Sequence, residues 1–170
     1  DNLQKALRIM QKANQIHLAA ISYSLLLGQI FKLDMLRIGK NVNICNTNGE
    51  ELFLPAVIKN NDCIIIISYS GEIHNLCSLA RTLKGRSVPI IAITSLGDNE
   101  LKKYADVVLH ISTREKLYSK IAGYSNENSI KLILDILYSC YFNLMYDDNL
   151  ARRIAISKQA EVGRESTLEI

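Results

Sequence analysis

A chain of 170 residues with 48% hydrophobic and 22% charged residues is long enough to bury the core of one domain, and this composition excludes a disordered chain. The 20 basic and 17 acidic residues give a net charge of +3 and are interspersed, so the sequence contains no Lys/Arg block for binding nucleic acid. The sequence opens with no signal peptide, and its most apolar stretch, 130–146, carries charges and is shorter than a membrane span. We therefore expect a cytoplasmic protein that does not enter a membrane.

Strands and helices are predicted to alternate along the chain, from the spacing of the apolar residues. The expected order is helix 3–13, strand 16–21, helix 25–38, strand 42–45, helix 50–59, strand 62–68, helix 72–84, strand 90–94, a short helix 99–104, strand 107–111, a long helical region 119–146 and a helical tail 147–170. Five short strands separated by helices predict a three-layer α/β/α sandwich with one five-stranded parallel sheet, for which fold rules suggest the flavodoxin-like order 2-1-3-4-5. The whole chain, 1–170, is expected to form one domain with its core at about 15–146.

The tripeptide Ser-Tyr-Ser occurs twice, at 22–24 and 68–70, each time after an apolar run. In the expected strand order the reversal falls between strands 1 and 3, so both segments would meet at the carboxyl edge of the sheet, where ligands bind in such folds. Serine is also a favoured helix N-cap, and each segment could serve only to satisfy backbone amides. The second segment supplies two hydroxyls and is followed by Gly71, which permits close approach to the backbone, and this favours a phosphate site.

The stretches IIIISYSGE (64–72), IIAIT (90–94) and YADVVL (104–109) resemble the sugar isomerase (SIS) domain, most closely the phosphosugar-binding half of RpiR-type bacterial transcription regulators. The resemblance extends from about Gln15 to Tyr146. It implies a sugar-phosphate ligand, no cofactor, a homodimer or higher homo-oligomer, and DNA binding through an N-terminal helix-turn-helix domain. Because the sequence begins with Asp1 and not Met, we expect that domain to precede it. The ligand site that the resemblance implies consists of Ser22, Ser24, Ser68, Tyr69, Ser70, Gly71 and Glu115.

Three positions depart from the family pattern. Ala20 and Ser22 replace the two glycines of the first loop, and Ile73 replaces the threonine that usually follows Ser-x-Ser-Gly-Glu. A lost donor to a charged oxygen costs about 1.5–3 kcal/mol, which would lower phosphate affinity about tenfold or more. Ser22 could compensate with its own hydroxyl, the larger side chains could narrow the pocket, or the domain could survive only as a dimerisation scaffold. The sequence leaves these alternatives open.

Enzymes that isomerise sugar phosphates need an acid or base near the sugar, and Glu72, His74 and Glu115 lie near predicted strand ends. We expect His74 to face solvent and Glu72 to favour the helix dipole without catalytic duty. Glu115 follows strand 5, where the resemblance to enzymatic relatives implies a working glutamate and the resemblance to regulators a sugar contact. His17 and His110 lie inside predicted strands and are expected to pack there. The leading hypothesis is an effector-binding domain without catalysis, and the alternatives are a small aldose-ketose isomerase and a ligand-free scaffold.

The cysteine and tyrosine residues are expected to have structural roles. The four cysteines form no C-x-x-C pair and show no metal-ligand spacing, so we expect reduced, mostly buried thiols and no metal site. There is also no G-x-G-x-x-G nucleotide fingerprint. Four tyrosines of the C-terminal helical region are expected to pack there, and the resemblance implies that subunits pair through such helices: Tyr118, Tyr124, Tyr138 and Tyr141.

Overall fold

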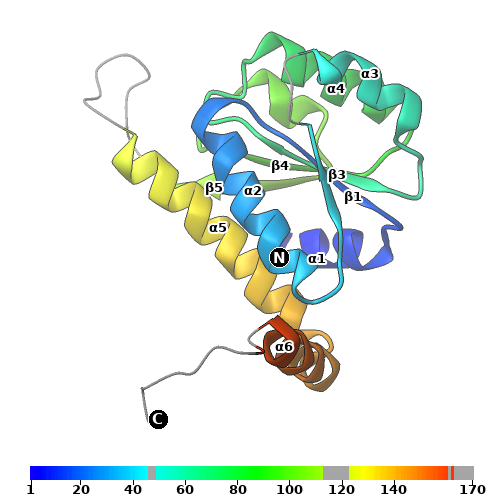
Figure 1. The fold of residues 1–170 in the computed structure, drawn as a ribbon. Coiled ribbons are helices and arrows are strands. Elements are labelled where there is room, and N and C mark those ends of the chain that lie inside the picture. The colour runs from blue at the N-terminus through cyan, green and yellow to red at the C-terminus, as the bar shows by residue number, and fades with distance from the viewer. Residues whose placement is uncertain (46–48, 113–122, 161, 163–170) are drawn as a thin grey trace.

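Strands and helices alternate in the computed structural model, which describes residues 1–45, 49–112, 123–160 and 162. The elements are α1 (Asn2–Lys12), β1 (Ile16–Ala19), α2 (Ser22–Leu36), β2 (Val42–Ile44), α3 (Glu50–Val57), β3 (Cys63–Ile67), α4 (His74–Gly85), β4 (Ile90–Ser95), the short 3₁₀ helix η1 (Glu100–Lys103), β5 (Val107–Ile111), α5 (Tyr124–Asn143) and α6 (Tyr146–Ala160). Figure 1 shows the sheet as the middle of three layers, with α1, α2 and α5 on one face and α3 and α4 on the other.

All five strands run parallel in the order β2-β1-β3-β4-β5, which confirms the predicted fold class and strand order. The reversal of strand order falls between β1 and β3, whose registers pair Ala19 with Ile66. A parallel sheet needs helical crossovers and has both faces covered. The chain meets this requirement with one apolar core on each face of the sheet.

Strand β3 shows why the sheet is buried on both faces. Its isoleucines alternate between the two cores, because successive side chains of a strand point to opposite faces. Ile65 and Ile67 pack with α1, α2 and α5, whereas Ile64 and Ile66 pack with α4. The expected two-sided burial of the isoleucine run is therefore confirmed.

Several predicted boundaries were wrong by a few residues. Strand β1 ends at Ala19, not at residue 21, and α2 begins at Ser22, not at residue 25, because the chain turns at Ala20 and Ile21 and leaves Ile21 exposed. Helix α4 begins at His74, not at residue 72, because residues 68–71 fold into a turn closed by a hydrogen bond from the Gly71 amide to the Ser68 carbonyl. The helical region predicted over 119–146 contains the whole of α5 and the first residue of α6, separated at 144–145, and residues 119–122 lie outside the described part. None of the described helices is long and apolar enough to cross a lipid bilayer.

The thiols behave as expected from the sequence. Cys45, Cys63 and Cys77 are buried and all four cysteines are free. Burial raises the pKa of Cys63 to about 12, and burial together with the neighbouring Glu50 raises that of Cys45 to about 11. These thiols are therefore protonated and unreactive at neutral pH.

Two histidines in strands have different surroundings. His17 on β1 is buried, as expected, and its Nε2 lies 3.6 Å from the Asp62 carboxylate, beyond hydrogen-bond length. Asp62 accepts instead from the backbone amides of Gln15 and Lys59. The expectation that His110 packs inside the sheet was wrong, because β5 is an edge strand and leaves its side chain exposed.

Candidate functional site

The two Ser-Tyr-Ser segments lie at the same edge of the sheet, because they follow the neighbouring parallel strands β1 and β3. Residues 22–24 form the first turn of α2, and residues 68–70 lead from β3 to α4. The N-cap residues of these two helices are Ile21 and Ile73, whose apolar side chains cannot accept a hydrogen bond from the first amides. Two helix N-termini without a side-chain cap therefore face this edge, and such termini favour an anion.

The first segment is strained at Ser22. Its φ of +54° lies in the left-handed region, which costs an L-residue with a side chain about 1–2 kcal/mol. Glycine adopts this conformation without that cost, so the backbone here suits the glycine that Ser22 replaces. Ser22 is exposed and Ser24 is half-buried on the first turn of the helix. Both serines thus lie in the turn of helix that directly follows the end of β1.

The second segment folds on its own hydroxyls. Ser68 is only 2% exposed, and its Oγ accepts a hydrogen bond of 3.1 Å from the Gly71 amide. The Oγ of Ser70 accepts from the Glu72 amide at 3.2 Å. Each hydroxyl accepts in these bonds and keeps its own proton to donate. The serines therefore shape the turn as acceptors; Ser70 is half-buried, whereas Ser68 is buried beneath the turn.

Gly71 is required by packing within the protein. Its φ is +67°, and a Cβ at this position would overlap the side chain of Asn99. The sequence suggested that the glycine lets a ligand approach the backbone. In the structure the space beside Gly71 is filled by Asn99, and contact with this side chain is the reason for the glycine. The Gly71 carbonyl accepts from the amide of Leu101 at 2.9 Å, which ties the turn to η1.

Asn99 is the residue of this edge that the sequence analysis missed. It is buried, and its Nδ2 donates to the Thr94 Oγ1 at 3.0 Å while its Oδ1 accepts from the Lys102 amide. The Glu72 Oε1 accepts from the amide of Glu100 at 2.8 Å and makes a second tie to η1. The only sequence signal was the preference of asparagine for the N-cap of a helix, here η1. Together these bonds hold the 68–72 turn against η1.

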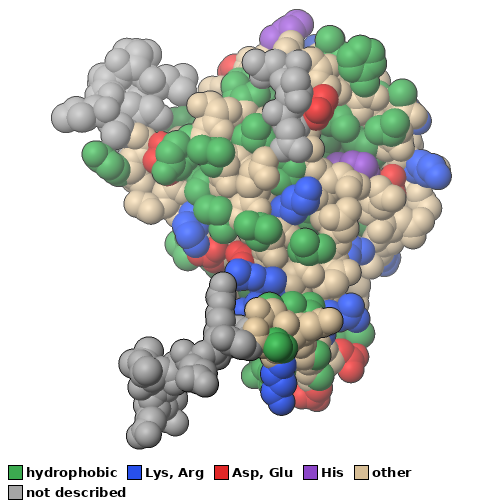
Figure 2. All heavy atoms as spheres, in the orientation of Figure 1, with side chains coloured by type: hydrophobic (Ala, Val, Ile, Leu, Met, Phe, Trp, Pro, Cys, Tyr) green, Lys and Arg blue, Asp and Glu red, His purple; other side chains and the backbone are tan. Residues whose placement is uncertain are grey.

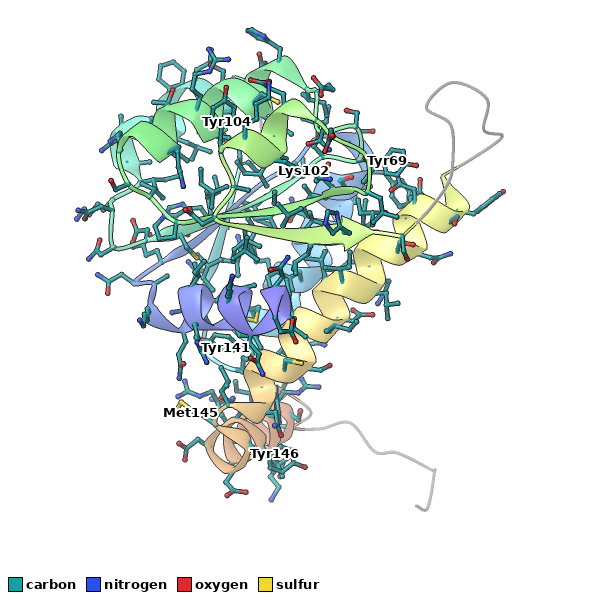
Figure 3. The ribbon with its side chains drawn as sticks, turned by 180° about the vertical axis from the view of Figure 1, so that it is seen from behind. Tyr69, Lys102, Tyr104, Tyr141, Met145 and Tyr146 are labelled. Carbon is teal, nitrogen blue, oxygen red and sulfur yellow. The ribbon has the colours of Figure 1, made fainter. Side chains whose placement is uncertain are left out.

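Tyr69 joins the turn to the neighbouring strand. Its carbonyl accepts from the Ser95 amide at 3.1 Å, and its half-buried side chain packs against the core beneath α2 and α5. Figure 3 shows Tyr69 and Lys102 at one end of the molecule and Tyr141, Met145 and Tyr146 at the other. The predicted site and the α5–α6 junction are thus at opposite ends of the fold.

Two of the three candidate acid and base groups are exposed. His74 is exposed, as expected, at the first residue of α4. Glu72 is exposed, and one of its carboxylate oxygens is engaged by η1. Glu115 lies outside the described residues. A shallow hollow of about 660 Å³ lies beside Glu72, and its walls carry charged and amide side chains: Glu72, Asp98, Asn99, Glu100, Lys102 and Lys103.

The chain matches a known domain family and several solved structures. The model of the SIS domain family matches residues 9–139. The Vibrio vulnificus NanR protein, solved with ManNAc-6P, superposes with a TM-score of 0.84 at 15% identity over 97% of this chain, which spans only 62% of that NanR chain.

Two further solved structures share the fold. The sugar isomerase domain of an RpiR transcription factor from Sphaerobacter thermophilus superposes with a TM-score of 0.78 at 13% identity. The superposed part is 92% of this chain and 86% of the RpiR chain. A Methanococcus jannaschii protein superposes with a TM-score of 0.71 at 19% identity, over 89% of this chain and 83% of the M. jannaschii chain. From its structure a function as 3-hexulose-6-phosphate isomerase was inferred for that protein. At these identities the likeness concerns the fold, and the fold is shared by regulators and enzymes.

Proposed function

The chain belongs to the SIS domain family, and we propose that it binds a sugar phosphate as the effector domain of a bacterial transcription regulator of the RpiR type. The observation that carries this proposal is the meeting of two seryl segments and two helix N-termini at the point where strand order reverses. Open α/β sheets bind ligands at such a point, and helix N-termini bind phosphate. The NanR neighbour, solved with ManNAc-6P, supports the ligand class.

In the proposed complex the phosphate oxygens accept hydrogen bonds from the hydroxyls of Ser68 and Ser70 and from the amide of Tyr69. The first turn of α2 adds Ser22 and Ser24 from the other side. Ile73 adds no donor, so the hydroxyl of Ser22 compensates for the threonine that the family pattern has at that position. Gly71 keeps the turn in place, and Glu115 contacts the sugar.

A regulator needs no chemistry at this site, only a ligand that prefers one of two states of the protein. We propose that the domain pairs as a homodimer in the cytoplasm and that a helix-turn-helix domain preceding residue 1 binds DNA. The RpiR neighbour, which is described as a transcription factor, supports the role in regulation. Glu72, a candidate base of the rival isomerase, is engaged by the amide of Glu100, and this favours a structural role.

Thermal unfolding of the chain with and without ligand tests the proposal. The probes are inorganic phosphate, ManNAc-6P and a panel of pentose and hexose phosphates. Ligand at about a hundred times its Kd adds roughly 2.7 kcal/mol, or about 5–10 °C in Tm for a domain of this size. We expect one sugar phosphate to give this shift, and we expect the Ser68→Ala/Ser70→Ala variant to lose it.

The controls separate loss of the site from loss of the fold. Ser139→Ala changes an exposed serine on α5 and should keep the full shift. Ser24→Ala leaves the buried turn intact and should still reduce the shift. A shift that survives in the double variant would place the ligand elsewhere, and no shift with any probe would favour the ligand-free scaffold. Turnover of a sugar phosphate followed by NMR would instead favour the isomerase.

A further inference from the structure

A cavity of about 380 Å³ lies at the amino-terminal edge of the sheet, at the end of the molecule opposite to the seryl segments. Its walls come from the end of α1, from the turn at 38–40 between α2 and β2, and from α5 and α6 where these helices meet. Figure 3 labels Tyr141 and Met145, two of its lining residues, at this end of the fold. The volume is typical of a small-molecule site, for which roughly 300–1,000 Å³ is usual. The proposed function makes no use of this cavity.

Arg152 reaches from α6 to the turn between α2 and β2. Its guanidinium lies against Gly39, where a Cβ would overlap the Nη1 and Cζ atoms. Gly39 has a φ of +77°, so the turn brings a backbone without a side chain to this place. Asp148 lies four residues before Arg152, the spacing at which ion pairs form along a helix, yet Arg152 has neither an ion pair nor a hydrogen bond with any described residue. Its planar set of N–H donors is therefore available to a ligand.

Lys40 adds a second cation to the same cavity. Its Nζ donates to the carbonyl of Ala13 at 2.9 Å, which fixes the ammonium group near the start of β1. An ammonium carries three protons, and this bond uses one of them. Lys40 is thus held in place and can still donate to an anion.

Tyr141 supplies a neutral donor to the cavity. It is half-buried and packs against the core, as expected from the sequence, whereas the expectation for Tyr124 was wrong, since it is 71% exposed at the first residue of α5. The Tyr141 hydroxyl makes no hydrogen bond with a described residue, and burial raises its pKa, so it keeps its proton at neutral pH. A tyrosine hydroxyl in such surroundings usually has a partner, and a ligand in the cavity would provide one.

Charge and apolar surface together indicate the kind of ligand. The lining holds two cations, Lys40 and Arg152, and one carboxylate, Asp148, so a single positive charge is in excess. Figure 2 shows Lys and Arg side chains around the place where α6 meets the rest of the molecule in Figure 1. A monoanion with an apolar body fits these features, and the guanidinium fork matches the two oxygens of a carboxylate. The lining also includes four apolar side chains: Ile38, Leu144, Met145 and Ala151.

We propose that this cavity is a second ligand site, which binds a small organic carboxylate with an apolar body. The carboxylate accepts two parallel hydrogen bonds from Arg152 and one each from Lys40 and the Tyr141 hydroxyl. The apolar body packs against Leu144 and Met145. Because the walls come from α1, the turn after α2, α5 and α6, a bound ligand fastens α6 to the rest of the domain. The site goes beyond the proposed function and does not depend on it.

Methionine methyl groups allow a direct test by NMR. The chain has three methionines, of which Met145 lines the cavity, whereas Met10 and Met35 are 0% exposed within the core. The probes are benzoate and isovalerate, each beside its amide, which has the same shape and no charge. With isotope-labelled methionine, we expect at least one of these carboxylates to move the Met145 signal in a saturable way and to leave the Met10 and Met35 signals in place. The amides should move none of the three signals.

Variants of the lining show whether these groups hold the carboxylate. We expect Arg152→Gln to raise the Kd of the carboxylate about tenfold or more, because a charge-assisted pair of hydrogen bonds is lost. Tyr141→Phe keeps the ring and should raise the Kd roughly two- to tenfold. The matched control is Lys158→Gln, which changes an exposed cation further along α6 and should leave the Kd unchanged. Unaltered Met10 and Met35 signals show that each variant is folded.

Two results would overturn the assignment. One is a Met145 signal that neither carboxylate moves or that the amides move equally, and the other is a Kd that Arg152→Gln and Tyr141→Phe both leave unchanged. The outcome is independent of the sugar-phosphate assay. A chain that responds at Met145 but shows no thermal shift with any sugar phosphate would keep this site and lose the proposed function, and the opposite pair of results would do the reverse.

Discussion

Ser22 combines a strained backbone with a hydroxyl at the proposed phosphate site. Its φ of +54° is one that glycine adopts freely, and strain of this kind persists where the side chain has a use. We expect Ser22→Gly to raise the free energy of unfolding by up to about 1 kcal/mol, measured in urea, because it relieves the strain. The same variant should weaken sugar-phosphate binding in the thermal-shift assay.

The companion variant for this test is Ser22→Ala, which removes the hydroxyl and keeps the strain. It should weaken binding without gaining stability. If Ser22→Gly gained stability and bound the ligand as well as the unaltered chain, the hydroxyl would have no role in the site.

Individual site residues were predictable to different degrees. The seryl segments could be placed from the sequence because apolar runs mark the strand ends that precede them. Asn99 could not, because its contact with Gly71 joins parts of the chain that only the fold brings together. The double role of Ser68 and Ser70, as acceptors within the turn and donors to a ligand, also depends on geometry that spacing does not reveal.

At the scale of elements, η1 holds the 68–72 turn in place. Because Gly71 has a φ of +67° and lies against Asn99, we expect Gly71→Ala to lower the free energy of unfolding by about 1–3 kcal/mol. It should also abolish the sugar-phosphate shift, since the turn would have to move. Urea denaturation followed by circular dichroism measures the first effect.

Gly85→Ala is the matched control for this prediction. Gly85 is the last residue of α4, and a Cβ there would meet no atom within 4 Å. Alanine is the better helix former, so this variant should be neutral or slightly stabilising. Equal losses from both substitutions would mean that the contact with Asn99 has no special weight.

The existence and order of the elements were predictable, whereas their ends were not. Hydrophobic runs were enough for the five strands, whereas their order was assumed from the flavodoxin-like pattern and is confirmed by the structure. The end of β1 was placed two residues late because Ile21 continues an apolar run although the chain has already turned. The end of an element depends on local hydrogen bonds, which apolar periodicity does not report.

The stability of the whole molecule should depend on pH through His17. Burial lowers the pKa of this histidine in the folded state, although the nearby Asp62 opposes the shift. The unfolded chain therefore takes up the proton at a higher pH than the folded chain. We expect the free energy of unfolding to be largest above about pH 6.5 and to fall as the pH drops below it, measured by urea denaturation between pH 5 and 8.

Substitution of single histidines checks this assignment. His17→Leu should flatten the decrease below pH 6.5, because no group remains there to take up the proton on unfolding. His74→Gln changes an exposed histidine and should leave the profile as it is. A profile that is the same in all three proteins would assign the pH dependence to other groups.

The exposed apolar face of α2, formed by Tyr23, Leu26, Ile30 and Leu33, is a feature that the sequence analysis did not find. A helix that is apolar all round is expected to be buried, and the sequence alone does not show which of its faces the sheet covers. Only the fold shows that Leu27, Phe31 and Met35 fill the core and that the other apolar face remains open.

The contact between α1 and β5 has a consequence for how the protein is made. The Asn2 side chain donates to the carbonyl of Val108, 106 residues further along the chain. A ribosome adds about 5–20 residues per second, so α1 must wait roughly 5–20 s for the strand on which it docks. During synthesis the apolar face of α1, formed by Ala6, Leu7 and Met10, has no sheet edge to cover it. Helix α1 is made before every strand of the sheet and is yet among the last elements to be locked in place, so the nascent chain needs protection there.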